Sequence, residues 1–129
     1  ALLCAVGTLR AGAGRLQVAT TAGAAPLVAA TVPEARVIAL PEARSGAVST
    51  RARARLDELA AHADAIVVGP GMLEADATSR MLAGWLAGLP AIPVVVDAAA
   101  LCALSCDAGA TGASLILTPH AGEAARLLG

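Results

Sequence analysis

Short apolar runs and longer amphipathic stretches alternate along the 129 residues of this chain. Runs typical of strands, each bounded by turn residues, occur at residues 15–20, 36–40, 65–68, 93–97 and 114–117. Stretches typical of helices lie at residues 1–10, 24–31, 50–62, 75–89 and 98–104 (a short helix or helical turn), and again after His120. Strands that alternate with helices predict parallel pairs joined by right-handed crossovers. We therefore predict the α/β class, with a mostly parallel, doubly wound sheet in a three-layer architecture.

The composition narrows the functional classes to which the chain can belong. Hydrophobic residues make up 57% of it, but there is one Trp and no Phe or Tyr, so the core depends on aliphatic side chains. Stacking platforms for nucleic acid need aromatic residues, and a net charge of −1 does not attract phosphate backbones. Residues 16–33 and 81–96 are uncharged, but prolines interrupt both, so neither is expected to span a membrane. We expect neither nucleic acid nor membrane partners.

The cysteines suggest a reducing compartment. Cys4, Cys102 and Cys106 are an odd number, which argues against a secreted disulfide framework. Cys102 and Cys106 stand four residues apart and can share a helix face, but no histidine near them completes a zinc set. We expect both to be buried thiols. We also expect no metal site in this chain and a cytoplasmic location.

A glycine-rich turn follows the third apolar run. Gly69 and Gly71 flank Pro70, directly after residues 65–68 and before a predicted helix. Glycines allow a ligand to approach the backbone closely, and a helix N-terminus favours anions. A plain tight turn explains the same residues, and the G-x-G-x-x-G spacing of a dinucleotide fingerprint is absent. Both interpretations of this turn stay open.

Two later strand ends carry an ionisable residue each. Asp97 ends a valine-rich run, and its carboxylate fits a metal, a ribose hydroxyl or a helix N-terminus that it caps. His120 fits hydrogen bonding or proton transfer to a ligand, or a helix cap with Glu123 in the first turn. Because open α/β sheets bind ligands at the carboxyl ends of their strands, we expect His120 to stand at that edge.

Four segments, in this order, resemble the ADP/ATP-dependent NAD(P)H-hydrate dehydratase family and its carbohydrate-kinase-like domain. They are Thr-Leu-Arg-Ala-Gly-Ala-Gly at 8–14, Val-Val-Gly-Pro-Gly-Met at 67–72, Pro-Val-Val-Val-Asp-Ala at 93–98 and Leu-Thr-Pro-His-Ala-Gly-Glu at 117–123. The last segment is the most specific, and the four run from one end of the chain to the other.

The resemblance implies a ribokinase-like fold and a lyase that removes water from hydrated NADH or NADPH at the expense of ADP or ATP. It implies that Gly69, Gly71 and His120 hold this hydrated nucleotide, and that Asp97 supports the same crevice. The cofactors that it implies are ADP or ATP, with Mg²⁺ expected. It also implies an NAD(P)H-hydrate epimerase as a fused or separate partner.

The resemblance further implies that residues 1–129 form one partial domain, without the family's N-terminal start and C-terminal Gly-rich nucleotide loop. The family's catalytic aspartate would lie beyond the chain end, so we expect weak or no activity from this chain alone. A sheet cut partway exposes apolar surface, and we expect a homo-oligomer. Ala99, Leu73 and Ala121 replace the family's usual aspartate, glycine and proline. The alternatives are a ribokinase-like small-molecule kinase and a catalytically inactive binding remnant.

Overall fold

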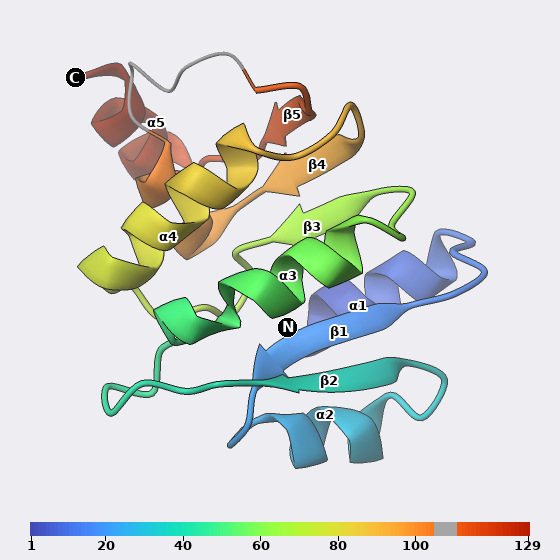
Figure 1. Ribbon diagram of the computed structural model, residues 1–129. Coiled ribbons are helices and arrows are strands. Elements are labelled where there is room, and N and C mark those ends of the chain that lie inside the picture. The colour runs from blue at the N-terminus through green and yellow to red at the C-terminus, as the bar shows by residue number, and fades with distance from the viewer. Residues whose placement is uncertain (105–110) are drawn as a thin grey trace. The chain divides into compact units, whose positions relative to one another are not determined.

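The structure is a computed structural model that describes residues 1–104 and 111–129. These residues divide into two compact units, Ala1–Ser49 and Thr50–Gly129, each with its own parallel sheet (Figure 1). The elements of the first unit are α1 (Leu2–Arg10), β1 (Gln17–Thr21), α2 (Ala25–Thr31) and β2 (Arg36–Leu40). Those of the second are η1 (Thr50–Ala52), α3 (Arg53–Ala60), β3 (Ile66–Val68), α4 (Asp76–Ala87), β4 (Pro93–Val96), η2 (Ala98–Ala103), β5 (Ser114–Leu117) and α5 (Ala121–Leu128).

The first unit is a β-α-β arrangement. Strands β1 and β2 pair in parallel, from Gln17 opposite Arg36 to Thr21 opposite Leu40, and α2 packs against both. Pro26 stands in the first turn of α2, where a missing N–H breaks no helical hydrogen bond. The buried aliphatic side chains of this unit include Val28, Val32, Ile38 and Leu40.

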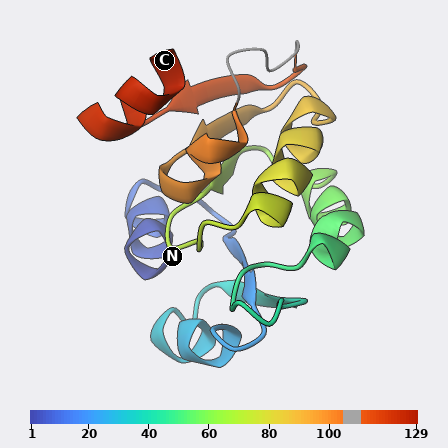
Figure 2. The ribbon, with the colours of Figure 1, turned by 90° about the vertical axis from the view of Figure 1, so that its left-hand side faces the viewer.

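The second unit contains a three-stranded parallel sheet in the order β3-β4-β5. Because each strand is added on the same side of its predecessor, right-handed crossovers place α4 and η2 on the same face. These two helices contact each other, as Figure 2 shows. The side chains of Val94 and Val96 beneath them are fully buried. The core around them includes Leu82, Trp85, Leu86, Ala100 and Leu101.

The opposite face of this sheet carries an apolar row. Val67, Val95 and Ile116 are partners in register across the three strands, and alternation along each strand directs them away from Val94 and Val96. Val67 is 44% exposed and Ile116 is 55% exposed. This row provides apolar surface of the kind on which the expected self-association depends, and the association itself stays a prediction.

The alternation of strands and helices predicted from the sequence is confirmed, and the last strand has the predicted bounds. The helix predicted over residues 50–62 begins as the 3₁₀ turn η1 before α3, and it ends at Ala60. No helix in the described parts of the chain combines the length and the apolar character that crossing a membrane requires.

The prediction that Cys102 is a buried thiol is wrong. Cys102 lies in η2, a 3₁₀ helix with three residues per turn. This helix buries Ala100, Leu101 and Ala103, and Cys102 falls on its exposed side. Cys106 lies outside the described residues. The assumed α-helical winding therefore does not describe Ala98–Ala103.

Candidate functional site

The carboxyl ends of β3, β4 and β5 meet at one edge of the second sheet. Val68, Val96 and Leu117 form the last row of strand partners. Beyond this row, the Asp97 N–H donates to the Val68 carbonyl oxygen at 3.0 Å, and the Thr118 N–H donates to the Val96 carbonyl oxygen at 3.2 Å. Ladder-like hydrogen bonds thus continue past the strands, and they align the three segments that the sequence singled out.

Gly69 is a buried packing position at this edge. Its φ of +116° lies in the region that favours glycine. A Cβ at this position would lie 1.7 Å from the Asp97 carbonyl oxygen and 2.9 Å from the Ala100 Cβ. The same carbonyl oxygen accepts the Ala100 N–H at 3.1 Å and so begins η2. The absent side chain of Gly69 therefore makes room for the neighbouring strand end, a contact between residues far apart in the sequence.

Gly71 completes a tight turn and is exposed. The Met72 N–H donates to the Gly69 carbonyl oxygen at 2.9 Å, which closes the turn around Pro70 and Gly71. Gly71 has a φ of +78°, a value that an L side chain adopts only at a cost. The tight turn predicted as one interpretation is confirmed. It leaves the backbone of Gly71, unlike that of Gly69, open to a ligand.

Asp97 stands at the N-cap position of η2 but does not act as a side-chain cap. It is half-buried, and its side chain makes no capping hydrogen bond. The next residue, Ala98, has a φ of +47°, an uncommon value for a residue other than glycine. The interpretation of the Asp97 carboxylate as a helix cap is therefore wrong. Backbone contacts to β3 hold the segment instead.

His120 caps α5, as one of its two interpretations predicted. Its Nδ1 accepts the Gly122 N–H at 3.0 Å and the Glu123 N–H at 3.4 Å. The Glu123 carboxylate accepts the His120 N–H at 2.9 Å, which completes a reciprocal capping box. The imidazole remains 71% exposed, so this structural role leaves its Nε2 side accessible.

An ion pair between α5 and the loop that follows β3 was not predicted from the sequence. The Arg126 guanidinium lies 3.9 Å from the Glu74 carboxylate, so α5 approaches the loop that follows β3. The pair is largely exposed and is worth about 0–1 kcal/mol. Residues 74 and 126 are 52 positions apart in the sequence (126 − 74), so no local sequence pattern connects them.

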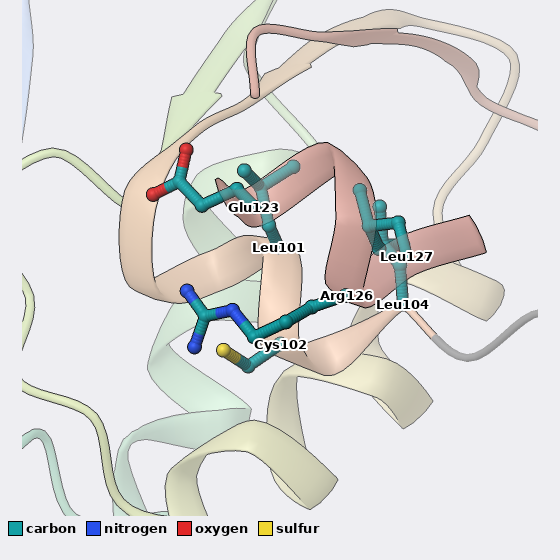
Figure 3. Close-up of a pocket in the computed structure, with 6 residues that line it drawn as sticks. All are labelled: Leu101, Cys102, Leu104, Glu123, Arg126 and Leu127. Carbon is teal, nitrogen blue, oxygen red and sulfur yellow. The ribbon is translucent and has the colours of Figure 1, made fainter. Parts of the chain in front are cut away.

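A shallow pocket also lies between η2 and α5. It has a volume of about 120 Å³ (Figure 3). Arg126 and Cys102 direct their polar ends toward the same side of it. The six lining residues are Leu101, Cys102, Leu104, Glu123, Arg126 and Leu127. No sequence pattern predicts this pocket, because it depends on how two separate helices pack.

Parallel strands bring an exposed glycine, a carboxylate and an imidazole to the carboxyl-terminal edge of the sheet, the edge at which open α/β proteins bind their ligands. The sequence model of a carbohydrate-kinase-like protein family, described as NAD(P)H-hydrate dehydratase, matches residues 1–129 of this chain. The chain belongs to this NAD(P)H-hydrate dehydratase family.

Two curated relatives illustrate the match. The ADP-dependent (S)-NAD(P)H-hydrate dehydratase of Xanthomonas campestris is 38% identical, over 99% of this chain and 43% of its own length. The bifunctional NAD(P)H-hydrate repair enzyme Nnr of Moorella thermoacetica is 40% identical, over 98% of this chain and 24% of its own length. The chain therefore spans less than half of the length of these relatives.

A solved structure agrees with the sequence match. The ADP/ATP-dependent NAD(P)H-hydrate dehydratase from Bacillus subtilis, co-crystallized with ATP/Mg²⁺ and soaked with CoA, has a TM-score of 0.68 and 28% sequence identity. The similarity covers 98% of this chain and 42% of that one. The ribokinase-like α/β fold implied by the resemblance is confirmed.

Proposed function

We propose that the protein removes water from hydrated NADH or NADPH, with ADP or ATP as the driving nucleotide. In this proposal the present chain supplies the wall that holds the nicotinamide nucleotide. One observation carries it: Gly71, Asp97 and His120 belong to segments that converge at a single sheet edge. Family membership supports the choice of substrate.

Each of these residues offers a different chemical group. The exposed backbone of Gly71 allows a ligand to approach without a side chain in between. The Asp97 carboxylate is a hydrogen-bond acceptor suited to a hydroxyl group. His120 presents its exposed Nε2 side as a donor. Gly69 contributes indirectly, because its missing Cβ lets the turn sit against Asp97.

ADP or ATP and Mg²⁺ are proposed for the protein as a whole, and no residue of this chain is assigned to them. The sequence contains no Gly-Thr-Gly-Gly-x-Gly-Asp stretch that would cradle phosphates. Within residues 1–104 and 111–129, no three His, Cys, Asp or Glu side chains gather to hold a metal ion. The nucleotide supplies the leaving-group chemistry when bound, and this chain binds and orients the hydrated substrate.

The test is recovery of NADH absorbance from hydrated NADH, ADP and Mg²⁺ by a protein of the relatives' full length that contains this chain. His120→Ala removes a hydrogen bond to the substrate and is expected to lower kcat/KM by about 10- to 100-fold. His62→Ala is the matched control, since His62 is exposed in the turn that follows α3 and lies outside the edge. A lack of ADP-dependent recovery, or equal rates for the two variants, would contradict the proposal.

Ala99 favours a second candidate, a catalytically inactive binding protein. This half-buried residue lies in η2, two positions after Asp97, where the resemblance to the family implies a second aspartate. Alanine offers no charge and no acceptor. A binding protein would bind hydrated NADH without converting it to NADH. In that case Ala99→Asp, which restores the missing carboxylate, would be expected to produce measurable recovery of NADH. A small-molecule kinase would instead consume ATP to phosphorylate an alcohol substrate, and it would not convert hydrated NADH.

Three further parts of the proposal concern the surroundings of the protein. An epimerase acting on the same hydrates is proposed as a fused or separate partner, in line with the bifunctional relative. The exposed row of Val67 and Ile116 supports a homo-oligomer. The free thiols of Cys4 and Cys102 suit the reducing cytoplasm.

A further inference from the structure

The two nitrogens of the His120 imidazole have different surroundings. Nδ1 accepts two backbone N–H groups, from Gly122 at 3.0 Å and from Glu123 at 3.4 Å. A ring nitrogen that accepts hydrogen bonds carries no proton, so the hydrogen-bond network assigns the proton of the neutral ring to Nε2. While the cap of α5 is intact, His120 can offer a ligand only a donor.

Glu123 contacts both ends of the same residue. One carboxylate oxygen accepts the His120 N–H at 2.9 Å, and the other lies 3.4 Å from Nε2. The side chain of Glu123 is 13% exposed, against 71% for His120. At 3.4 Å the second contact is longer than an optimal N–H···O bond. The carboxylate thus places a negative charge beside Nε2, which favours a proton on this nitrogen, and the exposed ring can donate the Nε2–H to a ligand.

Gly122 provides the space that this ring position needs. A Cβ on Gly122 would lie 3.1 Å from the His120 Cε1 and 3.4 Å from its Nδ1. A larger residue would force the imidazole to shift by a few tenths of an ångström. The histidine, the glycine and the glutamate therefore act as one local unit, set by residues 120–123.

We propose that Glu123 is a positioning residue that holds His120 as an Nε2–H donor toward the substrate. The inference rests on the proposed function, because it takes His120 to contact the hydrated nucleotide. It also defines the group that is recognised: an acceptor oxygen, such as a carbonyl, hydroxyl or phosphate oxygen of the substrate.

The first experiment needs no substrate. Two-bond ¹H–¹⁵N spectra of the 129-residue chain, recorded where the imidazole is neutral, report which nitrogen carries the proton. We expect His120 to show a fully unprotonated Nδ1, with the averaged values of a free ring for the exposed His62. An averaged or Nδ1-protonated His120 would overturn the positioning proposal, whatever the enzyme does.

The decisive variants separate capping from positioning. Glu123→Gln keeps an oxygen that can accept the His120 N–H, because Gln also serves in capping boxes, but it removes the second oxygen that faces Nε2. In the full-length protein we expect Glu123→Gln to raise KM about tenfold with little change in kcat, the effect of losing a negative charge that lies 3.4 Å from the donor nitrogen. A purely structural cap would leave KM unchanged, and that result would overturn the proposal.

Two controls keep the outcomes distinct. Glu58→Ala removes an exposed α3 carboxylate that pairs with Arg55, and it should leave KM and the His120 spectrum unchanged. In a His120→Ala background, Glu123→Gln should have no further effect on KM, since Glu123 acts through the imidazole. If the spectra are as expected but His120→Ala does not change KM, the proposed substrate contact fails while the assigned tautomer stands.

Discussion

The turns after β3 and β5 stand at the same sheet edge but are built in opposite ways. At Gly69 the backbone is buried against Asp97, and the absence of a side chain is the essential feature. At His120 a large side chain is exposed and is held by hydrogen bonds within four residues. One turn is specified by close packing and the other by local polar contacts. Stability and ligand binding should therefore respond differently to substitutions in the two turns.

Gly69→Ala should have the largest effect on stability. The added Cβ would meet the Asp97 carbonyl oxygen at 1.7 Å, and the residue would keep an unfavourable φ, so the strand ends must separate. We expect a loss of about 3 kcal/mol or more in the free energy of unfolding. Urea unfolding followed by fluorescence of the buried Trp85 measures it.

Gly84→Ala is the matched control within the same unit. Gly84 lies inside α4, and its nearest contact to an added Cβ is an Arg53 side-chain nitrogen at 3.5 Å. Replacing a helical glycine should stabilise the chain by about 0.5–1 kcal/mol. Similar losses for the two variants would show that packing at the strand ends does not set the difference.

Gly71→Ala should have an intermediate effect. Gly71, like Gly69, has a positive φ, here +78°. Unlike Gly69, it is exposed at the surface of the turn. The expected cost is about 1–2 kcal/mol, the penalty for placing an L residue in this region. Thermal melting followed by circular dichroism measures it. A cost equal to that of Gly69→Ala would mean that φ alone, and not the contact with Asp97, governs the turn.

His120→Ala should have a smaller effect on stability than on binding. The substitution removes the side-chain half of the capping box, which is worth about 1 kcal/mol in the free energy of unfolding. The loss should appear as faster hydrogen exchange of the Gly122 and Glu123 amides, which donate to Nδ1. Unchanged exchange rates would contradict the cap.

His120→Ser should change stability least. Serine with Glu123 three residues later forms the common capping box, so unfolding should change by no more than about 0.5 kcal/mol. The Nε2–H donor is nevertheless lost, and substrate binding should fall as far as in His120→Ala. Wild-type affinity for hydrated NADH in this variant would show that His120 serves the helix alone.

The sequence predicted the parts of this edge that depend on local spacing. The Gly-Pro-Gly turn follows from its own residues, and the His120 cap follows from a glutamate three positions later. The alternation of short apolar runs with amphipathic stretches was enough to locate the strands. These features need no knowledge of which segments become neighbours.

Features that depend on distant neighbours could not be predicted. The burial of Gly69 results from the carbonyl of Asp97, which directly follows the next strand, β4. Cys102 lies on the exposed side of a 3₁₀ helix, and composition alone does not distinguish 3₁₀ from α-helical winding. The Asp97 side chain does not cap η2, because the backbone at Asp97 and Ala98 follows the contact with β3.

The most direct test of the account is amide chemical-shift mapping of hydrated NADH on the labelled protein, with intact NADH as the reference ligand. We predict that shifts specific to the hydrate cluster at Gly71, Asp97 and His120, at the edge where the three strands end. Shifts confined to the pocket between η2 and α5, around Cys102 and Arg126, would contradict the account, as would a complete absence of shifts.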